Sequence, residues 1–284
     1  MNSSEKMDYL NYKIDGLNNL MKEILINEYK ELSIKNNELN YLSYENIFLQ
    51  KIFLNTNTFL NIYRNKTSLI VFEKKILDVH SLNNILRNIM ETAVLYRNIY
   101  KQDKEDIKEL KFLIWQYRSL FKVTRETYKI KDKKIYSDNS IHLSEVKRLI
   151  EESLLFQQLK NPKDIFNRHN KDKYLCEIKS LKISFLNTSE VIKQYYIKFK
   201  EGELLYGYFS QYTHPSFQSF NELGTNHSES LESDWYKIFL SSFNSLIFTL
   251  CHFLWDYIGD KDLSYISDNA LLEEIKELNI KEFT

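Results

Sequence analysis

Residues 238–255 read IFLSSFNSLIFTLCHFLW and carry no formal charge over 18 positions. This length approaches what a helix needs to cross a bilayer. However, six of these positions are Ser, Asn, Thr or His, and lipid would leave such groups without partners. Lys237 and Asp256 bracket the stretch, and no flank rich in Lys or Arg gives it an orientation. The stretch therefore predicts a buried central helix and not a membrane span.

The rest of the composition predicts more helices of the same kind. Only 5 Gly and 2 Pro occur among 284 residues, and a β-rich fold needs turn residues about every 8–12 positions. We expect an all-α fold, a single multi-helix bundle of eight to ten helices. Its expected parts are an N-terminal helical hairpin over 1–65, a bundle core over 70–258 and an acidic tail helix over 259–284.

Apolar residues at helical spacing predict helices over 5–33, 39–64, 81–100, 103–128 and 144–160. Ser81 and Ser144 are the candidate N-caps of the third and fifth of these helices. Residues 129–143 are expected to form a charged loop, and residues 163–187 to hold short helices. Arg97 falls near the middle of an apolar stripe, a position for a charge only if something pairs with it.

Charge and cysteine usage favour a cytoplasmic protein. The formal net charge is +0, which gives no global reason to bind nucleic acid or an anionic membrane. The amino terminus shows no basic segment followed by an apolar run, and Cys176 and Cys251 predict reduced, buried thiols. No zinc-ligand cluster, di-iron pair or glycine-rich phosphate loop is present, so we expect no metal, no cofactor and no membrane partner.

The stretch ELLYGYFSQYTHPS, residues 203–216, contains the first candidate site. In a helix over 203–213, preceded by a break at Glu201-Gly202, Tyr206, Ser210 and His214 recur every four residues and form a ladder along one side. Pro215 ends this helix. His214 would then lie at the last turn, where the helix dipole favours a protonated imidazole.

A second helix contributes Arg87 and Glu91, which stand four residues apart and therefore side by side. If the two helices pack together, Glu91 could orient Arg87 or fix the tautomer of His214. Arg87 could then hold an anionic substrate while His214 moves a proton. The alternative is a polar cluster that fixes helix register, with every member satisfied by its neighbours.

These two motifs, an R-x-x-x-E helix that opens with Ser-Leu and a later Y-x-x-x-S-x-x-x-H-P helix, resemble a family of uncharacterised bacterial all-helical proteins. The resemblance covers about residues 70–258 and extends loosely to HEPN-like and abortive-infection proteins. It implies a metal-independent ribonuclease in which Arg binds phosphate and His moves a proton, often across a homodimer. HEPN nucleases carry this Arg and His close together in one helix, whereas Arg87 and His214 belong to two.

A basic segment could bind nucleic acid. Its candidate residues are Lys122, Arg125, Lys129, Lys131, Lys133 and Lys134. Tyr128 and Tyr136 are interleaved with them, and such a mixture can hold a phosphate backbone and stack bases. The segment could equally be a solvated helix end and loop, or meet the acidic residues near the carboxyl terminus within the chain or across a dimer.

The leading hypothesis is a bacterial defence or toxin protein that acts on RNA through Arg87, Glu91, Tyr206, Ser210 and His214. Arg87 would bind a phosphate, His214 would be the general acid or base, and the two hydroxyls would orient it. The alternative hypothesis is a non-catalytic module that binds a partner protein, in which the same residues are structural.

Overall fold

The computed structural model describes residues 3–32, 41–65, 67–69, 74–76, 78–129, 133–158, 173–178, 181–186, 200–210, 234–259, 261, 264–267 and 270–275. The chain divides into two compact units, which we describe separately. The first unit comprises Met1–Arg97 and Ile192–Thr284, and the second comprises Asn98–Val191. The single domain expected from the sequence, with its three parts, stays a prediction.

The fold is all-α, as expected. Nine helical segments lie in the described ranges, within the predicted eight to ten. The first unit contains α1 (Ser3–Leu32), α2 (Tyr41–Asn65), most of α3 (Val79–Tyr100), α8 (Lys200–Ser210), α10 (Asp234–Ile258) and a short helix over 270–275. The second unit contains α4 (Glu105–Lys129), α5 (Lys133–Glu152) and α6 (Leu154–Gln157).

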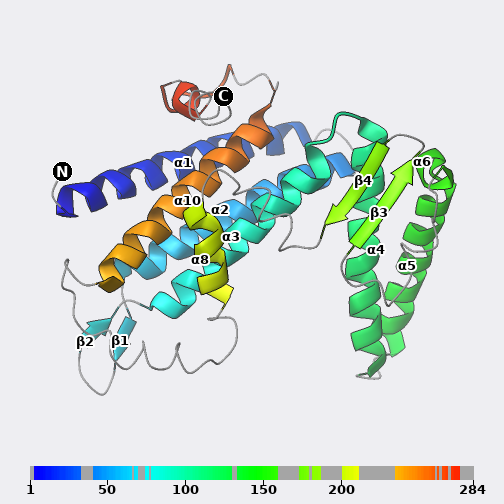
Figure 1. Cartoon of the computed structure of the whole chain (residues 1–284), viewed down its shortest axis with the longest axis horizontal. Coiled ribbons are helices and arrows are strands. Elements are labelled where there is room, and N and C mark those ends of the chain that lie inside the picture. Colours follow the sequence, from blue (N-terminus) through cyan, green and yellow to red (C-terminus); the bar gives the residue numbers. More distant parts are fainter. Residues whose placement is uncertain are drawn as a thin grey trace. The chain divides into compact units, whose positions relative to one another are not determined.

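Helix α10 lies in the core of the first unit, next to α1 (Figure 1). Phe243 of α10 meets the rings of Phe59 and Tyr63 on α2, and Phe253 meets Tyr96 on α3, all edge to face. The Thr249 hydroxyl donates to the Ser245 carbonyl, so part of the polar content of α10 is satisfied within the helix itself. The Cys251 thiol is buried, as predicted.

No helix among the described residues is long and apolar enough to cross a membrane. This agrees with the prediction that α10 is a buried helix of a folded protein. Phe243, Leu246, Leu250, Phe253 and Leu254 are all fully buried, which accounts for the apolar character of the stretch without lipid.

Side chains of α1 form an ion pair and hydrogen bonds with the segment that follows α10. Lys13 forms an ion pair with Glu274, and Glu23 accepts hydrogen bonds from the backbone and side chain of Ser267. A Cβ at Gly16 would lie 3.3 Å from Leu271, so the short helix over 270–275 approaches α1 closely. The predicted acidic tail helix is therefore present over 270–275.

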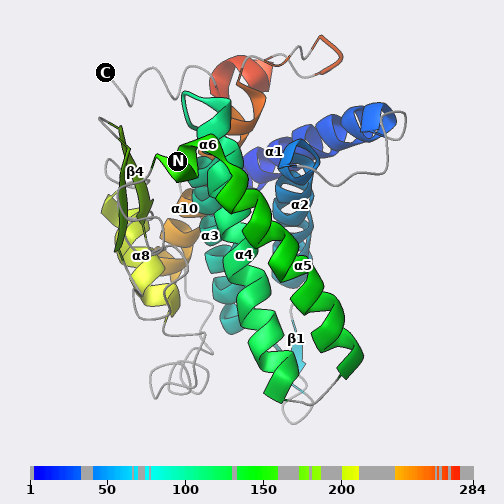
Figure 2. The same ribbon diagram turned by 90° about the vertical axis from the view of Figure 1, so that its right-hand side faces the viewer.

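The second unit is built on α4 and α5, which pack side by side (Figure 2). The core of this unit consists of residues from α4, α5 and α6: Ile107, Leu110, Ile114, Val146, Ile150 and Phe156. The expected loop over 129–143 is wrong, because α5 already begins at Lys133. Ser144 is not its N-cap either, since its hydroxyl donates to the Ser140 carbonyl within the helix, at 2.9 Å.

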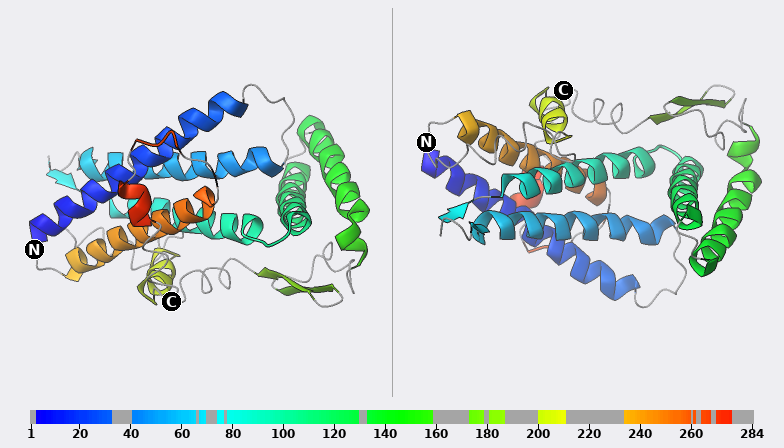
Figure 3. Two further views of the ribbon diagram at one scale, coloured as in Figure 1. Left: turned by 90° about the horizontal axis from the view of Figure 1, so that it is seen from above. Right: turned by 90° about the horizontal axis from the view of Figure 1, so that it is seen from below.

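Two short antiparallel hairpins interrupt the helical pattern. Strands β1 (Thr67–Leu69) and β2 (Lys74–Ile76) pair in the first unit. Strands β3 (Lys173–Ile178) and β4 (Leu181–Leu186) pair in the second, with Ile178 opposite Leu181 (Figure 3). The short helices expected over 163–187 are therefore wrong for 173–178 and 181–186. These strands alternate apolar and polar residues in part, a signal of period two that argues for a hairpin.

Two further helix boundaries differ from the prediction. Asp78, and not Ser81, caps α3: its carboxylate accepts the Ser81 backbone N–H at 3.0 Å, as an N-cap Asp does three residues before the bonded amide. Helix α8 begins at Lys200, so Glu201 and Gly202 lie within it and do not separate it from a preceding helix.

Candidate functional site

The structure brings together the two motifs that the sequence singled out. The Tyr206 hydroxyl of α8 donates to Glu91 Oε1 of α3 at 2.8 Å, across 115 residues of sequence. Arg87 Nε donates to the same oxygen at 2.9 Å. The Arg87 guanidinium also lies over the Tyr206 ring, with Cζ 5.3 Å from the ring centroid. Arg87, Glu91 and Tyr206, which we call the α3–α8 cluster, therefore form one contact group.

Arg87 and Tyr206 both keep their protons near neutral pH. Burial lowers the pKa of Arg87, but the charge of Glu91 and the contact with Tyr206 outweigh it, so that the guanidinium pKa is raised. Burial and the hydrogen bond to Glu91 raise the pKa of Tyr206, against the opposing effect of Arg87. Tyr206 is consequently a hydrogen-bond donor near neutral pH and not a base.

Ser210 occupies the next step of the predicted ladder. Its hydroxyl donates to the Tyr206 carbonyl at 2.8 Å, the back-bonding expected of a helical Ser. Helix α8 is described as far as Ser210. His214 and Pro215, the remaining members of the motif, lie outside the described residues.

The α3–α8 cluster is suited to holding an anion. The side chain of Arg87 is 22% exposed and that of Glu91 is 32% exposed, so both reach solvent in part. A guanidinium fixed by a carboxylate on one side and an aromatic ring on another is pre-oriented for phosphate. Within the cluster Glu91 already accepts two hydrogen bonds, so proton transfer at neutral pH requires a further group.

The predicted basic segment spans the end of α4 and the start of α5. Lys122, Arg125, Lys129 and Lys134 are exposed. Lys131 lies outside the described residues, and Lys133 is placed only as the first residue of α5. The Tyr128 and Tyr136 rings lie 5.5 Å apart between centroids. The aromatic and basic residues of this segment are therefore neighbours in space as well as in sequence.

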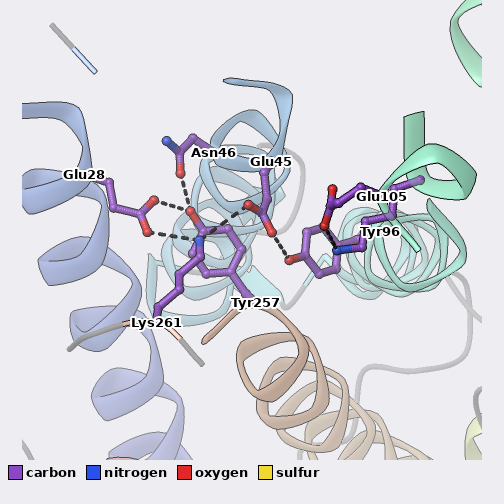
Figure 4. A network of polar contacts seen from close by, with 8 residues as sticks. Glu28, Glu45, Asn46, Tyr96, Glu105, Tyr257 and Lys261 are labelled. Carbon is purple, nitrogen blue, oxygen red and sulfur yellow. Dashed lines mark hydrogen bonds and ion pairs between the residues drawn. The ribbon is translucent and has the colours of Figure 1, made fainter. Parts of the chain in front are cut away.

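A polar network that sequence reasoning missed joins α1, α2, α3 and α10 (Figure 4). Lys261 Nζ lies 3.2 Å from Glu28 Oε1 and 3.6 Å from Glu45 Oε2. The Tyr257 hydroxyl contacts Glu28 and Asn46. Each carboxylate thus accepts a hydrogen bond from a tyrosine hydroxyl. Tyr257 donates to Glu28, and Tyr96 donates to Glu45 at 2.6 Å. The charge of Lys261 is therefore shared between the carboxylates of Glu28 and Glu45, and tyrosine hydroxyls donate to both.

Burial is the main reason that the pKa of Tyr96 is raised, and Glu45 adds to it. The same holds for Tyr257, with Glu28 as the second cause. Both tyrosines therefore remain protonated donors at any physiological pH. The network was missed because its members are scattered along the chain as single polar residues, without a shared spacing.

Arg97, which lies in the apolar stripe of α3, forms an ion pair with Asp256, as its position predicts. Its Nη1 lies 3.5 Å from Oδ2 of Asp256 on α10, whose side chain is 3% exposed. His252, one turn earlier, is buried, and its ring lies 4.1 Å from that of Phe248 between centroids, tilted by 50°. Among the described residues no group of three or more His, Cys, Asp or Glu side chains could hold a metal ion.

Comparison with known proteins gives one family. A model described as a family of unknown function, DUF5677, matches residues 58–231. The chain belongs to this family. No curated protein and no solved structure matches significantly.

The DUF5677 match begins within α2 and ends before α10, compared with the expected extent of 70–258. Both halves of the α3–α8 cluster fall inside it, as does His214. Glu28, Tyr257 and Lys261 of the missed network fall outside it. The likeness to HEPN and abortive-infection proteins stays a proposal.

Proposed function

We propose that this DUF5677 protein cleaves RNA without a metal ion, as a HEPN-like protein of a bacterial defence or toxin type. The observation that supports the proposal is the hydrogen bond from Tyr206 to Glu91 at 2.8 Å. It holds Tyr206 of α8, eight residues before His214 in the sequence, against the helix that carries Arg87. The proposal requires that the imidazole of His214 lie near the guanidinium of Arg87.

Arg87 would bind the scissile phosphate, because a guanidinium matches two phosphate oxygens at once. His214 would take the proton from the ribose 2′-hydroxyl, whose oxygen then attacks phosphorus. The bond to the 5′-oxygen breaks, and the imidazolium returns its proton to that leaving oxygen. The products are a 2′,3′-cyclic phosphate and a 5′-hydroxyl, and no other reactant is consumed.

Glu91 and Tyr206 act as positioning residues in this scheme. Glu91 orients Arg87 through the Nε contact at 2.9 Å, and Tyr206 holds Glu91 in place. The two protomers of a homodimer, which the HEPN resemblance implies, would each carry one such site.

A second candidate function is a non-catalytic module that binds a partner protein. The observation in its favour is that Glu91 accepts from both Arg87 and Tyr206. Such a satisfied cluster can fix the register of α3 against α8 without any chemistry.

Replacement of His214 by Ala, and of Arg87 by Lys, separates the two candidates. The purified full chain is incubated with RNA in the presence of a chelator, and 2′,3′-cyclic phosphate ends are measured. Cleavage that falls about a hundredfold or more in H214A, with an unchanged melting temperature, supports the enzyme. No cleavage by the wild-type protein, with a melting temperature that drops in both variants, supports the module.

Arg148 provides a matched control. It also pairs with a glutamate four residues later, Glu152, at 2.7 Å, but it lies on α5. Arg148→Lys should leave cleavage unchanged, whereas Arg87→Lys should lower it, since Lys cannot bind phosphate in the bidentate manner of Arg. Equal loss in both variants would contradict a specific role for Arg87.

A further inference from the structure

The second half of α4 carries a line of positive charge. Arg118, Lys122, Arg125 and Lys129, which we call the cationic stripe, are all exposed. At about 100° per residue their side chains fall within a sector of roughly 60° on one side of the helix. At about 1.5 Å per residue the stripe is roughly 16 Å long. Arg118 extends the predicted basic segment toward the middle of α4.

One carboxylate borders the stripe without cancelling it. Glu126 Oε1 lies 3.0 Å from Arg125 Nη2, and Glu126 Oε2 lies 3.0 Å from Lys129 Nζ. All three side chains are about half exposed, at 54%, 60% and 48% for Arg125, Lys129 and Glu126. Exposed ion pairs of this kind are weak, so a phosphate can replace the carboxylate at little cost.

An aromatic pair flanks the stripe. Tyr128 is 69% exposed, one residue before Lys129 on α4. Its ring lies 5.5 Å from that of Tyr136 on α5, tilted by 55°. A base can stack on an exposed tyrosine ring while its phosphate lies along neighbouring cations, the combination found in single-strand binding proteins.

We infer that the cationic stripe and Tyr128 bind single-stranded nucleic acid, with phosphates along the stripe and a base on the ring. This inference goes beyond the proposed cleavage, because it assigns a binding surface on α4 that functions without Arg87. A duplex fits less well, since its stacked bases offer no free face to Tyr128.

A membrane surface also fits less well. An interfacial helix presents one continuous apolar face beside its basic residues. The exposed Val123 instead lies roughly 130° around α4 from the centre of the stripe, at about 100° per residue. Tyr128, the other exposed large hydrophobic side chain of α4, lies on the opposite side of the stripe from Val123, so the two do not form one continuous apolar face.

The test measures binding of the full chain to fluorescent oligouridylate and oligothymidylate of about 20 nucleotides by anisotropy, at several salt concentrations. Each phosphate contact contributes about 0.7 to the slope of log affinity against log salt. The double variant R125Q/K129Q should lower this slope by about 1.4 and weaken binding roughly ten- to a hundredfold at low salt. Tyr128→Ala should weaken binding roughly five- to a hundredfold and leave the slope unchanged.

The matched control is K147Q/R148Q on α5. Lys147 and Arg148 are exposed to 46% and 59% and pair with Glu151 and Glu152, so the change in charge and in ion pairing is equivalent. This control should bind like the wild type. Equal weakening in both double variants would overturn the inference, as would the absence of binding or tighter binding to duplexes or anionic vesicles.

The result is separable from the outcome for cleavage. Oligothymidylate has no 2′-hydroxyl and cannot be cleaved by the proposed route, so its binding reports on the stripe whether or not the chain is a nuclease. Binding without cleavage would retain this inference and defeat the proposed enzyme. Cleavage by the wild type, with unaltered binding in R125Q/K129Q and Tyr128→Ala, would support the proposed enzyme and overturn this inference.

Discussion

Lys111 makes the stability of the second unit depend on pH in an unusual direction. The residue lies on α4 with 7% of its surface exposed, and its Nζ donates to Asn98 Oδ1 at 3.2 Å. Burial lowers the pKa of this amine from 10.5 to about 8. Burial is the cause of this shift, so the fold holds the charged form of Lys111 at a free-energy cost.

The sign follows from counting protons. Below pH 8 both the folded and the unfolded state bind the proton. Between pH 8 and 10.5 the folded state releases it while the unfolded state retains it, so the free energy of unfolding rises with pH. With about 1.4 kcal/mol for each unit of pKa, the full gain is about 3 kcal/mol, of which about 2 kcal/mol appears between pH 7 and 9.5.

The assay follows denaturant unfolding through the fluorescence of Trp115, which lies on α4 one turn after Lys111. Trp235 and Trp255 are replaced by Phe, so that the second unit is observed alone. The window ends at pH 9.5 because burial raises the pKa of Tyr117. Above pH 10, the unfolded chain releases this proton first, and stability falls again.

Lys111→Met should abolish the rise, because the titrating group is gone. At pH 7 this variant should be more stable than the wild type by about 2 kcal/mol, the charge penalty less about 1 kcal/mol for the lost hydrogen bond. Lys122→Met, an exposed control on the same helix, should keep the rise. A flat or falling wild-type curve, or the same rise in Lys111→Met, would refute this reasoning.

Three further predictions concern the packing of the first unit. A Cβ at Gly207 of α8 would meet nothing within 4 Å, whereas one at Gly16 would lie 3.3 Å from its nearest neighbour. Gly207→Ala should therefore raise stability by about 0.5–1 kcal/mol in denaturant unfolding, and Gly16→Ala should gain less. Tyr257→Phe removes a donor to a carboxylate and should cost about 2 kcal/mol in the same assay, whereas a cost near zero would contradict the contact. Arg97→Met leaves the buried Asp256 without this cation and should cost about 3 kcal/mol, more than Asp256→Asn, since Arg97 is 37% exposed and can be solvated.

The apolar positions of the helices were largely predictable from the sequence. The apolar spacing over 81–100 predicts a buried stripe of six residues, Leu82, Ile85, Leu86, Ile89, Met90 and Ala93. All are buried except Ile85, which is half-buried, because burial that recurs every three or four residues leaves a periodic signal. The need of Arg97 for a partner could be foreseen from its place in this stripe. That the partner is Asp256 could not, since ion pairing between distant helices leaves no local pattern.

The errors have local physical causes. The polar character of residues 129–143 predicts a loop, yet a helix that packs along one side of α4 needs few apolar positions. The β3–β4 hairpin was missed because its connection, residues 179–180, is Lys-Ser and lacks the Asn-Gly or Asp-Gly signal of tight turns. At the start of α3, Asp78 and Ser81 are both good caps, and spacing alone does not choose between them.

Polar side chains of α3 contact three different helices of the first unit. Glu91 meets Tyr206 of α8, Tyr96 meets Glu45 of α2, and Arg97 meets Asp256 of α10. Apolar burial is not directional, so the apolar stripe of α3 would tolerate several placements of its neighbours. Hydrogen bonds and ion pairs at fixed positions along α3 restrict each neighbouring helix to one placement. The hydrogen bond between Tyr206 and Glu91 is a contact of this kind that restricts the placement of α8 on α3, which is the positioning role that the proposed function gives these two residues.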